Sequence, residues 1–512
     1  MGLTGCAEVY ELHQQASNYK PLAFEAPEDI KPSLDSRNLR PDERPTKALR
    51  SDTQKEDSIR WLIDAKAIQQ LKQRKDPPKP QTSKKRMRLK PIILTKQEKT
   101  QRNIANFREV RAAIADILPG LEEGLIELYA RRENRPLWYG SQGWSPQAWQ
   151  ALELSLNGPL YGLPSRRYWT TPNYRLPDHQ EAGLIAQADI MLSRVLLLQT
   201  AELKAGFGAS MKTSVDLLDV AQQKGAIGRL FLNQEDKGRQ YQGLKSALAN
   251  LELSDAERLK VMLNMNRLRS SGEQLDAKRR IRVNMPSFHL DVFEGAALVR
   301  SMKVIIGQED RQTPVLHDKI VNLKFSPDWT VPRTAAREDF LPLLQSIPEK
   351  VIGEFDLEVY QGGKSLDPYK VDWATVDPNR IPYVLRQKPG PKNALGGVRF
   401  SMTNKQSIYL HDTPDKELFN LSLRMISSGC VRVSDAPWLA QWMMQDNQQA
   451  WNHKQVRAAM QKGIIEYQKL KEPVFVDIVY YTAMVDAKGR LRFYDDIYHH
   501  DAKLVAKFNL EK

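Results

Sequence analysis

The sequence predicts an α+β protein in which a helical scaffold domain is followed by a mainly antiparallel β domain with a lid insertion. Three observations predict this class. Apolar residues recur at steps of three and four over residues 103–270, they alternate with a period of two after about Arg280, and a Pro- and Gly-punctuated stretch at 332–391 interrupts the second pattern. The 512 residues suffice for roughly two to four folded units, and no uninterrupted apolar run approaches the ~18 residues that cross a bilayer.

Residues 1–102 are polar, charged and rich in proline, and they are predicted to form a disordered basic leader or tether. The chain carries a net charge of +14, and residues 72–102 alone hold twelve Lys or Arg against two acids. Because most of the net positive charge lies in this tract, no specific nucleic-acid binding is predicted for the folded body. The tract is suited to an anionic membrane surface. A basic-tailed envelope or nucleic-acid-binding protein is the non-enzymatic alternative.

The two cysteines, Cys6 and Cys430, are too few for a Cys-rich zinc cluster, and we predict neither a metal nor a cofactor. The start Leu3-Thr4-Gly5-Cys6 resembles the lipobox of a bacterial lipoprotein, although no charged or apolar leader segment precedes it in this sequence. Either the natural start lies upstream and Cys6 becomes a lipidated N-terminus, or the match to the lipobox is chance.

The helical domain is predicted over residues 103–275. Its first helix ends at Pro119-Gly120, a longer one carries the apolar face Leu184 to Leu198, and a third begins at the capping box Ser254-x-x-Glu257 and reaches about Leu268.

The β domain is predicted over residues 276–512. A hairpin turns at Glu294-Gly295, and further strands are expected at 397–402, 407–410, 474–482 and 491–494, the last two joined as a second hairpin. Residues 434–470 are predicted to be helical. The insertion at 332–391 is expected to lie over the sheet as a mobile lid, with Gly362-Gly363 and Pro389-Gly390-Pro391 as candidate hinges.

Cys430 follows Gly429 in a turn of small residues, which is a suitable place for a nucleophile. A thiol needs a neighbouring cation or base that lowers its pKa, and His411 is the obvious base because it ends the predicted strand at 407–410. Either the Asp412 carboxylate or a backbone carbonyl would orient the imidazole, and both options stay open. The amide groups of Cys430 and Gly429 are the expected oxyanion donors.

The segment His411-Asp412-Thr413-Pro414, followed by Ser427-Ser428-Gly429-Cys430-Val431-Arg432, resembles the signature of L,D-transpeptidases with a YkuD-type catalytic domain. Other segments resemble the large YcbB-like branch of this family: Asn264-Met265-Asn266-Arg267, Val283 to Phe288, Gly307 to Pro314, Trp329-Thr330-Val331-Pro332 and Arg386 to Gly396. Arg135-Pro136-Leu137-Trp138 resembles the helical scaffold of that branch. The branch usually carries a peptidoglycan-binding module, for which residues 241–264 leave no room.

The resemblance implies that Cys430 is the acylated nucleophile, that His411 is its base, and that Arg432 either holds a substrate carboxylate or supports the turn. Asp412 and Gly429 are expected to assist catalysis, and Ser428 and Tyr409, like Arg432, are expected to contact substrate. Many members carry His where this chain has Ser428. The implied activity is peptidoglycan remodelling, in which stem peptides serve as donor and acceptor and a Cys thioester leads to 3→3 cross-links. L,D-carboxypeptidase activity and transfer to another amine are the alternatives. The resemblance also implies inhibition by carbapenem-type β-lactams and a place in the periplasm.

Overall fold

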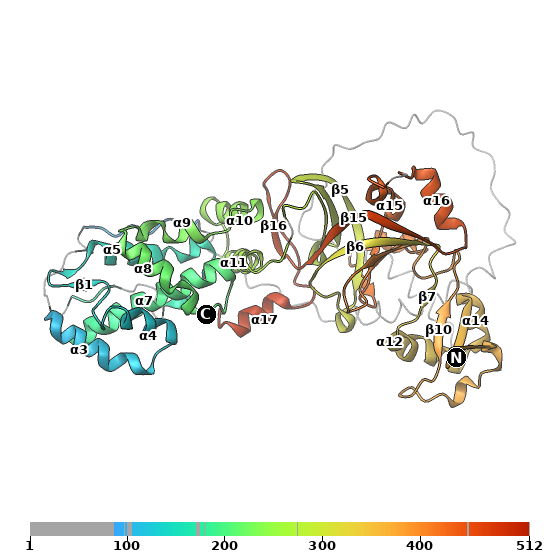
Figure 1. The fold of residues 1–512 in the computed structure, drawn as a ribbon, viewed down its shortest axis with the longest axis horizontal. Coiled ribbons are helices and arrows are strands. Elements are labelled where there is room, and N and C mark those ends of the chain that lie inside the picture. Colours follow the sequence, from blue (N-terminus) through green and yellow to red (C-terminus); the bar gives the residue numbers. More distant parts are fainter. Residues whose placement is uncertain are drawn as a thin grey trace. The chain divides into compact units, whose positions relative to one another are not determined.

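The computed structural model describes residues 87–96, 98–99, 105–169, 175–178, 180–273, 275–447 and 450–510 (Figure 1). These residues form two compact units that divide at 273/274 and at 479/480. The first unit is helical, and the second, from 275 to 479, is rich in β structure. The predicted division at 275/276 lies two residues from the first of these points. The chain beyond 479, which was predicted as part of the β domain, packs with the helical unit.

The helical unit contains the predicted helices and several shorter ones. The helix predicted to end at Pro119-Gly120 is α3, the long one is α7, and the one with the capping box is α11, in which both reciprocal capping hydrogen bonds are present. The helices are α3 (Phe107–Ile117), α4 (Glu123–Ala130), α5 (Pro146–Leu156), α6 (Ser165–Tyr168), α7 (Ala182–Ala205), α8 (Val215–Gln223), α9 (Leu230–Gln234), α10 (Arg239–Asn250) and α11 (Asp255–Arg269).

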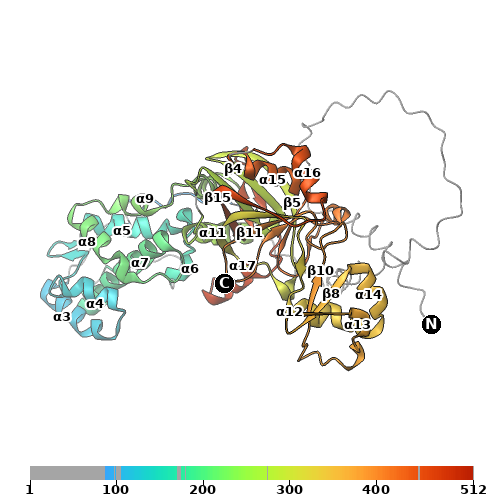
Figure 2. The same cartoon turned by 45° about the vertical axis from the view of Figure 1, so that its right-hand side comes forward.

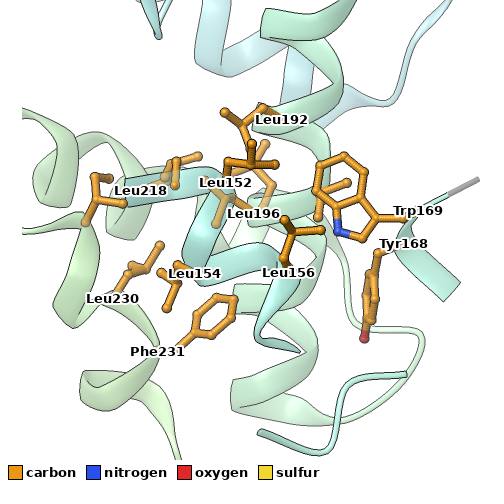
Figure 3. Close-up of a cluster of buried hydrophobic side chains, with 14 of the residues drawn as sticks. Leu152, Leu154, Leu156, Tyr168, Trp169, Leu192, Leu196, Leu218, Leu230 and Phe231 are labelled. Carbon is orange, nitrogen blue, oxygen red and sulfur yellow. The ribbon is translucent and has the colours of Figure 1, made fainter. Parts of the chain in front are cut away.

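Helix α7 is the centre of the helical core. Its Leu192 and Leu196 are fully buried and lie among side chains from α5, α8 and α9, including Leu152 and Phe231 (Figure 3). Among the described residues, α7 is the one helix that is long and apolar enough to cross a membrane, and 61% of its most apolar stretch is buried within the protein. The packing around α7 is that of a core helix.

A buried carboxylate fastens α7 to the segment that follows α4. Asp189 accepts hydrogen bonds from the Tyr129 hydroxyl at 2.6 Å and from the backbone N–H groups of Leu137 at 2.9 Å, Trp138 at 2.8 Å and Tyr139 at 3.1 Å. Burial raises the pKa of this carboxyl to about 6, despite the hydrogen bonds that favour its charged form.

Most of the predicted leader, including Cys6, lies outside the described residues. Its described part is not disordered as predicted, because Ile92 N–H donates to Asn157 Oδ1 at 2.7 Å and Leu94 N–H to Glu153 Oε1 at 2.9 Å. Leu94 also packs against the helical core. The last part of the basic tract is therefore attached to the end of α5.

The C-terminal segment adds a hairpin and a helix to the helical unit. Strands β16 (Ala483–Val485) and β17 (Leu491–Phe493) pair with each other. The predicted hairpin joined residues 491–494 to a strand at 474–482, but residues 474–479 are not part of the observed hairpin. Gln240 on α10 exchanges two hydrogen bonds with the backbone of Val485, at 2.8 and 2.9 Å. Helix α17 (His500–Lys507) follows and packs through Val505 against α11.

The β unit is built on a nine-stranded sheet in the order β13-β5-β14-β12-β11-β6-β15-β3-β4, and β4 also pairs with β5, which closes the sheet. Six of its pairings are antiparallel, in agreement with the predicted class; β12–β14, β13–β5 and β15–β3 are parallel. The strands are β3 (Arg279–Asn284), β4 (His289–Glu294), β5 (Ala297–Gly307), β6 (Leu316–Phe325), β11 (Val398–Met402), β12 (Leu410–His411), β13 (Met425–Ser427), β14 (Val431–Val433) and β15 (Glu466–Val479).

The predicted hairpin is β4–β5, with Leu290 and Val292 fully buried. The helical prediction for 434–470 was too long. Helices α15 (Ala436–Met444) and α16 (His453–Gln461) are present, but β15 begins at Glu466. Residues 466–469 pair with β6, and this pairing decides their structure over the helix propensity of Glu, Gln and Lys.

The insertion at 332–391 folds around a core of its own. Strands β7 (Trp329–Thr330), β10 (Val384–Gln387), β8 (Leu357–Gln361) and β9 (Lys364–Leu366) form a separate sheet in that order. Helices α12 (Arg333–Ala335), α13 (Leu341–Ser346) and α14 (Pro348–Phe355) lie beside it (Figure 2), and a π-helical turn at Ala336–Phe340 joins α12 to α13. Gly362 and Gly363 form the tight β8–β9 turn with φ of 56° and 80°, so they are not a hinge of the insertion.

Candidate active site

Strand pairing assembles the predicted site in the β unit. Strand β12 lies between β11 and β14, and its last residue, His411, is opposite Arg399 on one side and Arg432 on the other. The Val431 N–H donates to the Tyr409 carbonyl at 3.1 Å, which places Cys430 beside Tyr409 at the start of β14. Residues that are paired across strands share a face of the sheet, so His411, Arg399 and Arg432 point to the same side.

The turn that presents Cys430 is held by hydrogen bonds of its small residues. Ser427 Oγ donates to the Cys430 carbonyl at 2.6 Å and accepts from the Gly429 N–H at 3.2 Å. Gly429 has φ of 110°, which only glycine adopts without strain, and its carbonyl accepts from Thr313 Oγ1 at 2.8 Å. Because the Gly429 amide already donates to Ser427, the Cys430 N–H is the remaining one of the two predicted oxyanion donors.

A backbone carbonyl orients the imidazole. His411 Nδ1 lies 2.6 Å from the carbonyl oxygen of Asp412. A carbonyl only accepts, so Nδ1 carries the proton and Nε2 is left to accept one. Of the two options that the sequence left open, the structure has the carbonyl.

The Asp412 carboxylate holds the chain around this carbonyl instead of the imidazole. It accepts from the Gly397 N–H at 2.9 Å and forms an ion pair with Lys416. Gly396, at φ of 58°, comes so close that a Cβ would lie 2.5 Å from Asp412 Oδ2. The aspartate thus supports the geometry of His411 through the backbone.

The electrostatic surroundings keep the imidazole neutral. His411 is 5% exposed, and burial lowers its pKa to about 3, with the positive charges of Arg432, Lys416 and Arg399 acting in the same direction. The hydrogen bond to Asp412 opposes this shift without cancelling it. The imidazole is therefore neutral, with Nε2 free of a proton, at any physiological pH.

The thiol is also neutral. Burial raises the pKa of Cys430 above its ordinary value, although hydrogen bonding from Tyr409 and the charges of Arg399 and Arg432 act to lower it. Sγ lies 3.7 Å from the Ser407 carbonyl. The expected lowering of the thiol pKa is therefore absent in this state. No thiolate–imidazolium pair exists in this state, so a nucleophilic role of Cys430 would require the proton to leave the thiol during the attack.

The other predicted residues are all near the turn. Arg432 has a side chain that is 14% exposed and lies 3.9 Å from Asp415. Ser428 Oγ accepts from Arg311 Nη1 at 3.1 Å. The Tyr409 ring lies edge-on to His411 at 5.8 Å, and burial raises the pKa of the Tyr409 hydroxyl.

Two arginines were not singled out from the sequence. Arg311 forms ion pairs with Asp339 and Glu338 of the π-helical turn at 2.6 and 2.7 Å. It also donates to Ser428, so it links the insertion to the turn that presents Cys430.

The second arginine, Arg399, stacks over the Tyr409 ring at 5.2 Å. In the sequence, Arg399 is a charged residue between the apolar residues Val398 and Phe400 of a predicted strand. Only the pairing of β11 with β12 shows that it lies opposite His411. Within the described part of the chain, no cluster of three metal-binding side chains occurs.

Comparison with known families agrees with this geometry. Residues 278–502 match the L,D-transpeptidase catalytic domain (YkuD), and residues 123–248 match a scaffold domain. A "Putative L,D-transpeptidase" of Haemophilus influenzae is 34% identical over 246 residues, which cover 48% of each chain. The chain thus spans about half the length of this curated relative. The chain is thus similar over residues 123–248 to a scaffold domain and over residues 278–502 to the L,D-transpeptidase catalytic domain (YkuD), and within the second segment Cys430 directly precedes β14, the strand next to the one that His411 ends.

Proposed function

We propose that this protein is a cysteine acyltransferase that cross-links peptidoglycan stem peptides. Support comes from the placement of Cys430, which follows a glycine turn at the start of β14, next to the strand that ends at the neutral, oriented His411. In the first step Sγ attacks the carbonyl carbon of the third stem-peptide residue while its proton passes to His411 Nε2. The amide C–N bond then breaks, and His411 returns the proton to the departing amine.

The second step consumes the thioester. An acceptor amine attacks the acyl carbon, the C–S bond breaks, and His411 transfers the amine proton to the thiolate. When the amine is the side chain of the third residue of another stem peptide, the product is a 3→3 cross-link. Water in its place gives L,D-carboxypeptidase activity, and another amine gives exchange. The Cys430 N–H is suited to hold the oxyanion in both steps.

Mass spectrometry of muropeptides tests this proposal. Stem peptides incubated with the wild-type protein should yield 3→3 dimers, and Cys430→Ala should yield none. A carbapenem should add its mass to the wild-type protein but not to this variant. Equal amounts of 3→3 dimers from both proteins would contradict catalysis by Cys430. No dimers from either protein, together with an unmodified mass, would favour a basic-tailed envelope or nucleic-acid-binding protein instead.

We propose the periplasmic side of the cell envelope as its location, because mature stem peptides are found there. Cys6 would serve as a lipid anchor if translation starts upstream, and the tract 72–102 would lie against the anionic membrane surface. Fractionation of the full-length natural product tests both ideas: the wild type should be in the membrane fraction, and Cys6→Ala should be released by high salt. A Cys6→Ala product that stays membrane-bound in high salt would contradict the anchor.

A further inference from the structure

Three cationic side chains contribute to the potential at His411, and they differ in their partners. Lys416 forms an ion pair with the Asp412 carboxylate, and Arg432 lies 3.9 Å from Asp415. The guanidinium of Arg399 has no carboxylate and no hydrogen-bond acceptor among the described residues, and its Nε is buried. A half-buried guanidinium without an anion is unusual, because its charge loses solvation without compensation.

The position of Arg399 ties this charge to the reacting groups. Arg399 is the cross-strand partner of His411, and its guanidinium lies 5.2 Å from the centre of the Tyr409 ring. Its charge acts on His411, Tyr409 and the Cys430 thiol alike. An anion bound by Arg399 would thus be next to the base and the nucleophile.

The chemistry of the proposed reaction supplies such an anion. His411 must protonate the nitrogen of the departing amino acid. In a donor that ends at this amino acid, the carboxylate carbon is two bonds, about 2.5 Å, from that nitrogen. A guanidinium matches a carboxylate with two parallel N–H donors.

We propose that Arg399 binds the C-terminal carboxylate of the departing amino acid and thereby selects donor peptides that end one residue beyond the scissile bond. This inference rests on the proposed function and names the residue that reads the end of the donor. It transfers to Arg399 the carboxylate-binding role that the resemblance suggested for Arg432, whose guanidinium already has Asp415 beside it.

A pair of donors and a pair of variants test the proposal. Donor tetrapeptides with a free C-terminal carboxylate or a C-terminal carboxamide are compared by kcat/KM for release of the terminal residue, at pH 8, where the imidazole is neutral in every variant. The wild type should prefer the carboxylate about 10- to 100-fold, the range of a charge-assisted hydrogen bond. Arg399→Gln should lower this ratio to about one, mainly through the carboxylate donor, and Arg399→Lys should restore part of it.

Lys416→Gln is the matched control, because it removes one positive charge near His411 that is already paired with Asp412. Its donor ratio should stay near that of the wild type, whatever its rate. The same preference in Arg399→Gln as in the wild type, or no preference in the wild type, would overturn the inference while leaving acyl transfer intact. Release from neither donor by a folded wild-type protein would overturn the proposed function as well.

Discussion

Acidification from pH 7 to pH 5 should leave the first half-reaction almost unchanged. An ordinary histidine with a pKa of about 6.5 is only about 3% neutral at pH 5. His411, with its pKa lowered to about 3, is about 99% neutral at the same pH. Since the thiol stays protonated over this interval, its raised pKa adds no loss of its own. At pH 5, kcat/KM should therefore be about thirtyfold higher with the buried His411 than with a histidine of ordinary pKa.

The assay is the pH profile of kcat/KM for release of the terminal residue from a tetrapeptide donor, between pH 2.5 and pH 9, so that the acidic limb expected near pH 3 is included. Samples held at pH 5 and returned to pH 7 control for unfolding. Arg432→Gln is the informative variant, because Arg432 supplies the largest electrostatic contribution to the lowered pKa after burial. Its acidic limb should move to higher pH. A wild-type limb near pH 6.5, or a limb that Arg432→Gln does not move, would refute the neutral, buried imidazole.

Three further predictions concern parts of the structure outside the pair formed by Cys430 and His411. Asp189→Asn turns an amide NH2 toward backbone N–H donors, so the free energy of unfolding of the helical unit should fall by about 2–4 kcal/mol in urea titrations, and a loss below about 1 kcal/mol would contradict the network. Arg311→Gln breaks the link between Asp339 and Ser428 and should lower kcat about tenfold with partial recovery in Arg311→Lys, whereas unchanged kcat in both would show that the link does not position Cys430. Shortening the insertion at 332–391 while sparing the nine-stranded sheet should lower transfer relative to hydrolysis, and an unchanged ratio would make it a scaffold and not a lid.

The sequence predicts best where local chemistry decides the structure. The capping box at Ser254 and Glu257 marks the start of α11 because its two hydrogen bonds lie within four residues. The alternation around Leu290 and Val292 predicts the hairpin because one face must be buried. His411 at a strand end and Cys430 after a glycine turn are local patterns of the same kind.

What the sequence misses depends on contacts between distant segments. The placement of Arg399 opposite His411 follows from the register of β11 with β12, which no local pattern specifies. The same holds for residues 466–469, where pairing with β6 overrides helix propensity, and for Val485, which returns to α10 across more than two hundred residues. The sequence could not decide whether the Asp412 carboxylate or a backbone carbonyl orients His411, because residue types do not specify the direction in which the chain turns.

The acyl-enzyme itself is the most direct measurement of the central claim. The wild-type protein is mixed with a tetrapeptide donor, quenched in acid within the first turnover, and analysed by intact mass and by mapping of the digested protein. The expected adduct adds the mass of the donor minus that of the released terminal amino acid, it is attached to the peptide that contains Cys430, and it is absent from Cys430→Ala. Product formation without this adduct, or an adduct at another residue, would contradict a thioester at Cys430.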